Sequence, residues 1–120
     1  SKKTKAPDLV AFRYKYILVF EAKVRAKNLF SKTNNKYSDY ECVSFLINSK
    51  SAKDEIKENA ERMMSLLKIE APNNIEVIGG LIAGDDFSDH LHKIKEKELL
   101  LLYVDAETES VTIFQNKVGI

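Results

Sequence analysis

Four consecutive large apolar residues, Ile17 to Phe20, are followed at once by Glu21, Ala22 and Lys23. A short apolar run rich in β-branched and aromatic residues predicts a strand buried in a sheet. Burying an unpaired charge costs several kcal/mol, so charges at the end of such a strand need either partners or a function. This segment therefore constrains both the fold and the position of any site.

A second apolar run, residues 9–12, lies just before this strand and directly follows Pro7 and Asp8. Residues 13–15 form a short polar link into a strand expected over residues 16–24, which predicts an antiparallel hairpin. Antiparallel pairing returns Asp8 and Glu21 to the same end of the hairpin. Glu21 and Lys23, two residues apart, point to one face of the sheet.

The rest of the chain predicts helices alternating with strands. Residues 25–38 are polar and predict an exposed loop, and Ser38 to Glu41 matches a helical capping box, although residues 42–47 could also form a strand. Further elements are expected as a helix over 51–68 with Ser51 as its cap, a strand over 75–83, a helix over 86–97, and strands over 99–105 and 111–115. This order predicts an α/β fold with a mixed sheet and packed helices.

Length and composition favour one soluble domain. A chain of 120 residues that is 44% hydrophobic can form one core and is too short for two ordinary domains, so we expect residues 1–120 to be a single domain. No apolar stretch approaches the roughly 18 residues that span a bilayer, so we expect no membrane contact. Cys42 is the one cysteine and cannot form an internal disulfide, which agrees with a cytoplasmic location.

The charges are distributed unevenly along the chain. Residues 1–36 contain ten Lys and Arg residues but only the acids Asp8 and Glu21, a net charge of +8, and residues 37–120 carry −7. Basic residues around two isolated carboxylates suit a polyanion that must reach a cation held by those carboxylates. We expect Lys15, Arg25 and Lys27 to contact nucleic-acid phosphates.

The residues at the hairpin end suit metal-dependent cleavage of a phosphodiester. Asp8 and Glu21 can bind a hard cation such as Mg²⁺, and the backbone carbonyl of Ala22 can supply a third oxygen. Lys23 would lie beside the bound water, where it could orient that water and offset charge on the phosphate. Asp8, Glu21 and Ala22 are therefore candidate metal ligands, and Lys23 is a candidate catalytic residue.

Pro7-Asp8 and Glu21-Ala22-Lys23 resemble the motif of the PD-(D/E)xK nuclease superfamily, and the nearest likeness is to Mrr-like and type IIS restriction-endonuclease catalytic domains. The resemblance implies a restriction-endonuclease-like mixed central sheet flanked by helices. It implies a Mg²⁺-dependent endonuclease, with Mn²⁺ as a substitute, that hydrolyses double-stranded DNA in a restriction or defence system. Asp8, Glu21 and Lys23 would be its catalytic residues.

Other possibilities stay open beside this one. Many superfamily members have an acidic helix before the first motif strand, but six residues precede Pro7. We therefore expect this chain to lack that helix or to belong to a larger protein. The alternatives are an inactive nucleic-acid-binding or assembly domain of the same fold, or an RNA endonuclease. Partners besides DNA could include the remainder of a larger protein or a second copy in a homodimer.

Overall fold

A computed structural model describes residues 7–32, 36–96 and 98–115. Within these residues, five strands form one sheet in the order β1-β2-β3-β4-β5. The strands are β1 (Leu9–Arg13), β2 (Tyr16–Lys23), β3 (Glu76–Ala83), β4 (Leu100–Asp105) and β5 (Ser110–Gln115). The helices are α1 (Ala26–Leu29), α2 (Asp39–Ile47), α3 (Lys50–Leu66) and the 3₁₀ helix η1 (Ser88–Lys93). The expected α/β class is confirmed.

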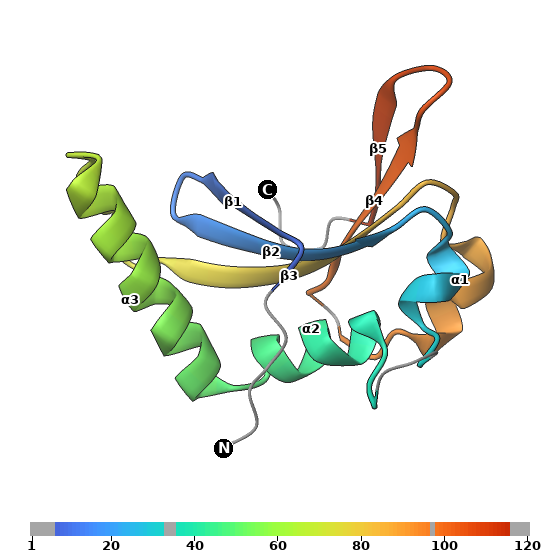
Figure 1. The fold of residues 1–120 in the computed structure, drawn as a ribbon, viewed down its shortest axis with the longest axis horizontal. Coiled ribbons are helices and arrows are strands. Elements are labelled where there is room, and N and C mark those ends of the chain that lie inside the picture. Colours follow the sequence, from blue (N-terminus) through green and yellow to red (C-terminus); the bar gives the residue numbers. More distant parts are fainter. Residues whose placement is uncertain (1–6, 33–35, 97, 116–120) are drawn as a thin grey trace.

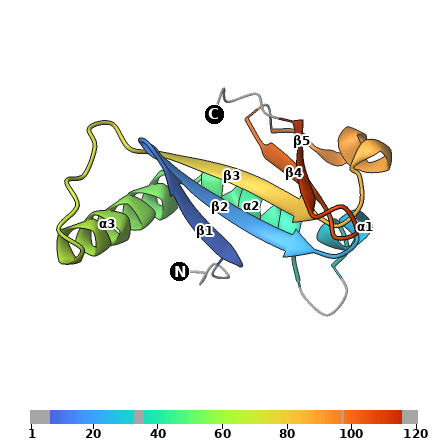
Figure 2. The same ribbon diagram turned by 90° about the horizontal axis from the view of Figure 1, so that it is seen from above.

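The sheet is mixed, as the element order predicted. β1 pairs with β2 in antiparallel register, β2 with β3 and β3 with β4 in parallel register, and β4 with β5 in antiparallel register. The connection from β2 to the parallel strand β3 passes through α1, α2 and α3. α2 runs beneath β2 and β3, and α3 starts on the same side and runs past the left end of these strands (Figures 1 and 2).

β2 is buried on both faces, which explains its continuous apolar sequence. Ile17 and Val19 point toward the helices and pack in a cluster with Leu46 of α2 and Ala60 of α3. Leu18 and Phe20 point to the opposite face, in a separate cluster with apolar residues of β3 and β4. Apolar residues of β2 therefore pack in one core on each face of the sheet. This packing on both faces fixes the position of the strand, including its last residues, Glu21 to Lys23.

The capping box predicted at Ser38 begins α2, and the helix reading of residues 42–47 is confirmed. The Ser38 side chain accepts a hydrogen bond from the Glu41 backbone N–H at 3.1 Å, and the Glu41 carboxylate accepts one from the Ser38 N–H, also at 3.1 Å. Reciprocal bonds of this kind satisfy two of the amide groups that a helix leaves without intrahelical partners. The start of α2 is thus fixed by its own sequence.

The long helix begins earlier than expected. The cap is Ser49, whose hydroxyl accepts a hydrogen bond from the Ala52 N–H at 3.2 Å, so the prediction of Ser51 as the cap is wrong. Both serines precede the apolar helical pattern, and only the backbone conformation decides which one is extended enough to cap. The helix itself covers Lys50–Leu66, close to the expected 51–68.

The two glycines of β3 allow close approach on opposite faces of the sheet. A Cβ atom at Gly79 would lie 2.6 Å from Cγ2 of Ile47 in α2, and one at Gly80 would lie 2.4 Å from the ring of Phe20. Real Cβ contacts are not this short. Gly79 therefore lets α2 lie directly against the sheet, which sets the distance between α2 and the end of β2.

The stretch expected as an exposed loop over residues 25–38 contains a short helix. Ala26 and Leu29 of α1 are buried in the core. The Ala26 N–H donates to the carboxylate of Asp85 at 2.6 Å, so a distant residue holds the start of this single turn. Four residues carry too little periodicity to reveal a helix, and part of the expected loop, residues 33–35, lies outside the described residues.

The helix expected over residues 86–97 is wrong in type and length, since η1 covers Ser88–Lys93 as a 3₁₀ helix. The expectation depended on Phe87 and Leu91 sharing a buried face. Phe87 is buried, but Leu91 is 41% exposed. A 3₁₀ helix has three residues per turn, so residues four apart do not lie on one face. Residue 97 lies outside the described part.

No helix in the described part of the chain is long and apolar enough to cross a membrane.

Candidate active site at the end of the hairpin

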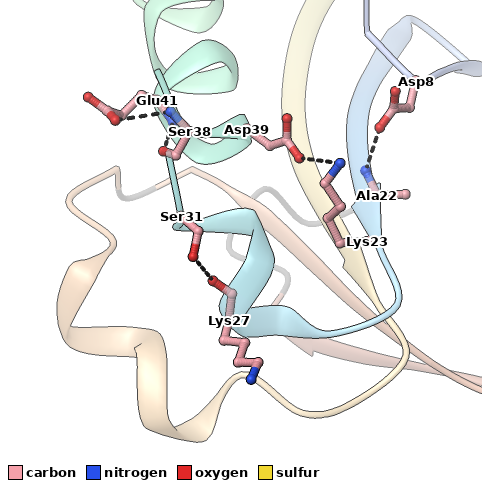
Figure 3. Close-up of polar contacts among 8 residues, drawn as sticks. All are labelled: Asp8, Ala22, Lys23, Lys27, Ser31, Ser38, Asp39 and Glu41. Carbon is pink, nitrogen blue, oxygen red and sulfur yellow. Dashed lines mark hydrogen bonds and ion pairs between the residues drawn. The ribbon is translucent and has the colours of Figure 1, made fainter. Parts of the chain in front are cut away.

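Asp8 lies where the expected hairpin places it, one residue before β1. Leu9 is opposite Phe20 in the antiparallel register, so Asp8 reaches the level of the following residues of β2. Its Oδ2 atom accepts a hydrogen bond from the Ala22 N–H at 3.0 Å (Figure 3). The structure therefore brings Asp8 to the Glu21-Ala22-Lys23 segment.

Glu21 is a buried carboxylate at the end of an apolar strand, with 1% of its surface exposed. Because strand side chains alternate between faces, Glu21 points to the same side as Val19, the side covered by the helices. An ionised group so far out of water requires polar or charged neighbours. Glu21 is therefore held in a fixed place on the helix side of β2.

Ala22 contributes through its backbone. The N–H and C=O of one strand residue point to the same edge of the strand, and the Ala22 N–H points to Asp8. The carbonyl oxygen of Ala22 therefore lies on the edge of β2 at which Asp8 sits. The use of that carbonyl as a metal ligand stays a prediction.

Lys23 ends β2 and reaches the helix side of the sheet. Its Nζ atom lies 3.3 Å from Oδ2 of Asp39, the first residue of α2 (Figure 3). The Lys23 side chain is 44% exposed, whereas that of Asp39 is 7% exposed. The ammonium group is therefore held on the face that Glu21 also uses, and solvent or a ligand can still reach it.

Asp39 was not among the residues predicted for the site, although the sequence contains a signal for it. The capping box places the start of a helix at Ser38, and a helix that connects parallel strands begins near the carboxyl end of the strand before it. The capping box therefore gave a reason to look for the start of α2 near Lys23, although α1 lies between β2 and α2 in the chain. The capping box predicts where the helix starts, but it does not predict which side chain its first residue contacts.

The donor set at this site suits Mg²⁺. Asp8, Glu21 and the Ala22 carbonyl offer hard oxygen atoms, and Mg²⁺ typically binds one or two carboxylates and completes its shell with water and substrate phosphate. In the described residues, no group of three or more His, Cys, Asp or Glu side chains could hold a metal ion. The binding of Mg²⁺ by Asp8, Glu21 and the Ala22 carbonyl therefore stays a prediction.

The basic residues predicted to bind nucleic acid do not form one surface. Lys15 lies in the β1–β2 turn, at the opposite end of β2 from Lys23. β2 has eight residues, and a strand rises about 3.3 Å per residue, so the two lysines are about 25 Å apart. Arg25 and Lys27 lie near the Lys23 end and line a hollow of about 390 Å³, together with His90 and three aspartates, Asp85, Asp86 and Asp89.

Ion pairs join the basic first part of the chain to its acidic remainder. These pairs are Lys15 with Glu76 (3.7 Å), Lys23 with Asp39 (3.3 Å), Arg25 with Asp85 (2.9 Å) and Lys32 with Glu41 (3.8 Å). The opposite net charges of residues 1–36 and 37–120 therefore partly neutralise each other in the fold.

A network of hydrogen bonds between α2 and the segment before β4 fixes this helix in place. Glu96, in the segment before β4, accepts hydrogen bonds from Tyr40 Oη at 2.6 Å and from Ser44 Oγ, and Tyr40 Oη also accepts one from the Lys95 N–H at 3.0 Å. Burial and the bond to Glu96 raise the pKa of Tyr40. Burial alone would raise the pKa of Glu96, but the bonds from Ser44 and Tyr40 outweigh it and lower that pKa. The first turn of α2, which carries Asp39, is therefore well anchored.

Comparisons of the chain with protein-family models, with curated proteins and with solved structures give no match.

Proposed function

We propose that this chain is a Mg²⁺-dependent endonuclease domain that hydrolyses phosphodiester bonds in double-stranded DNA, in a restriction or defence system. We propose further that its mixed sheet has the restriction-endonuclease-like fold, with which an antiparallel hairpin followed by a helical connection to a parallel strand is compatible. The observation that carries the proposal is the hydrogen bond from Ala22 N–H to Asp8. It joins the two halves of the PD and ExK pattern at one end of the hairpin.

The role of Lys23 follows from its position and exposure. Phosphodiester hydrolysis builds negative charge on the phosphate, and a fixed cation next to that charge stabilises the transition state more than the ground state. The Lys23 ammonium group is accessible, and it lies on the same face as Glu21. We assign to it the stabilisation of the phosphate and the orientation of the attacking water.

Asp8, Glu21 and the Ala22 carbonyl would hold the cation. When bound, Mg²⁺ supplies further stabilisation of the charge that develops on the phosphate. The protein keeps the two carboxylates in place before any ligand arrives, since Asp8 is bonded to the β2 backbone and Glu21 is packed in the core. Such preorganisation reduces the cost of assembling the site during the reaction.

A plasmid-nicking assay with Mg²⁺ tests the proposal on the full chain. We expect Asp8→Asn, Glu21→Gln and Lys23→Met each to lower the nicking rate by a factor of at least about a hundred, as is typical when a group that stabilises the transition state is removed. Asp54→Asn is the matched control, because Asp54 is an exposed acid in α3 that pairs with Lys50. Equal nicking by the wild-type chain and all four variants would refute the assignment.

A second candidate is a nucleic-acid-binding or assembly domain without turnover. It is favoured by the absence of a cluster of three or more acidic or metal-binding side chains in the described residues, and by the neutralisation of the basic segment through ion pairs. Calorimetric titration with Mn²⁺ separates the two candidates. Salt-sensitive DNA binding without Asp8-dependent Mn²⁺ binding would favour the domain without turnover.

The nuclease proposal includes a choice of substrate that one further assay tests. In competition between double-stranded DNA and RNA of equal length, we expect DNA to be cleaved. Preferential cleavage of RNA would instead identify an RNA endonuclease, which must accommodate the 2′-hydroxyl groups.

A further inference from the structure

We infer that Asp39 is a positioning residue for Lys23, a role that the nuclease motif itself does not contain. Its carboxylate, on the first turn of α2, holds the Lys23 ammonium group on the side of the sheet to which Glu21 points. The effect of this positioning on catalysis rests on the proposed nuclease function. The positioning itself is a property of the protein without metal or substrate, so it can be tested separately.

The geometry of the pair is the first argument. Oδ2 of Asp39 is fully buried, and it lies 3.3 Å from Nζ of Lys23. A lysine side chain has a flexible stem of four carbon atoms with many rotamers, so a half-exposed lysine does not stay in one place without a partner. A buried carboxylate gives Lys23 such a partner on one side and leaves its other side open.

The support behind Asp39 is the second argument. Asp39 follows Ser38, whose capping box fixes the start of the helix, and its carboxylate lies at the positive end of the helix dipole. Tyr40, the next residue, is bonded to Glu96 and to the Lys95 N–H. The residues on both sides of Asp39 in the chain, Ser38 and Tyr40, are therefore fixed by hydrogen bonds. Support of this kind is needed for a residue that positions another side chain.

The third argument compares this pair with an exposed one. Lys50 and Asp54 in α3 form a pair with a nearly equal distance of 3.2 Å, but their side chains are 91% and 49% exposed. Exposed pairs contribute little, because water and salt screen them. The acid in the Lys23 pair is almost completely buried, so we expect an ordered ammonium group at Lys23 and a mobile one at Lys50.

NMR of the lysine ammonium groups tests the positioning without any nuclease assay. In the protein without metal, we expect a slowly exchanging ammonium signal that Lys23→Met removes and thereby assigns. Asp39→Asn should abolish this signal, while Asp54→Asn should leave it unchanged. The inference is overturned if the Lys23 signal persists in the Asp39→Asn protein.

Kinetics then test the catalytic meaning. We expect Asp39→Asn to lower kcat for plasmid nicking about tenfold to a hundredfold, as supporting residues around a site typically do, with KM for DNA changed less than twofold. Asp54→Asn should leave both constants unchanged. A rise in KM with an unchanged kcat would overturn the positioning role, because it would assign Asp39 to DNA binding.

Two further outcomes have defined meanings. If Asp39→Asn does not fold, Asp39→Glu replaces it: this variant keeps the charge but is one methylene longer, and it should retain the ammonium signal with a lower kcat. An unchanged kcat in Asp39→Glu would overturn the inference. If the wild-type chain shows no nicking while the Lys23 signal depends on Asp39, the proposed nuclease function fails and the positioning of Lys23 stands.

Discussion

Replacement of Gly79 by alanine should push α2 away from the sheet. The new Cβ would lie 2.6 Å from Cγ2 of Ile47 and 2.8 Å from Cγ1 of Val43, both in α2. Carbon atoms in contact are about 3.5–4.0 Å apart, so the helix must retreat by roughly 1 Å or both side chains must change rotamer. Asp39 begins the same helix, so this retreat would also draw its carboxylate away from Lys23.

The expected cost follows from two opposing effects. Overpacking of this kind destabilises a protein by about 1–3 kcal/mol. Alanine also restricts the unfolded chain, which returns about 0.4–1 kcal/mol. The net loss for Gly79→Ala is then about 1–2 kcal/mol, and for a chain of this length we expect Tm to fall by about 4–8 °C.

Urea denaturation followed by circular dichroism measures this loss, and a double-mutant cycle locates its cause. Ile47→Ala destabilises the protein by itself, but it also removes the atom closest to the new Cβ. The double variant should therefore be more stable than the sum of the two single effects by at least about 0.5 kcal/mol. Strictly additive effects, or a Gly79→Ala protein as stable as the wild type, would refute the reasoning.

Two pH-dependent predictions concern groups near α1 and α2. The hydrogen bond from the Ala26 N–H, aided by Arg25, lowers the pKa of Asp85 in the folded protein. The ionised Asp85 therefore stabilises the fold fully at pH values above the ordinary carboxyl pKa, and this contribution is lost as the pH falls through the pKa of Asp85 in the folded state. Asp85→Asn should therefore lower the urea midpoint at neutral pH and match the wild type in strong acid; a constant difference would contradict this. Burial and the hydrogen bond to Glu96 raise the pKa of Tyr40 above its ordinary value of 10.0. The neutral Tyr40 therefore stabilises the fold at pH values below 10.0, and this contribution is lost as the pH rises through the pKa of Tyr40 in the folded state. Tyr40→Phe should remove a late component from the ultraviolet titration of the tyrosines, and an unchanged titration would contradict this.

Much of the fold could be predicted from local patterns. The hairpin and the parallel crossover follow from apolar runs separated by polar links, and the start of α2 follows from the capping box at Ser38. Elements that depend on distant residues were not predictable in this way. α1 is fixed by Asp85, almost sixty residues later in the chain, and η1 adopts a helical period that its apolar spacing does not indicate.

The candidate site divides in the same manner. Asp8, Glu21 and Lys23 could be placed together because antiparallel pairing and side-chain alternation depend only on neighbouring strands. The separation of Lys15 from Arg25 depends on the length of β2, and the ion pairs that neutralise the basic segment depend on long-range packing. Net charge along a sequence does not show which charges face each other in the fold. The arrangement of Lys15, Arg25 and Lys27 was therefore the part of the site that the sequence predicted least well.

The place of β1 at the edge of the sheet has a consequence for how the site can be lost. Among the residues that the structure describes, β1 pairs with β2 alone, and Leu9, Val10 and Phe12 of β1 are each exposed to 44% or more. Short edge strands open locally at a lower free-energy cost than the core strands. Local opening of β1 would move Asp8 away from β2, while Glu21 and Lys23 would stay in place. Asp8 could therefore leave and rejoin the candidate site without unfolding of the whole protein.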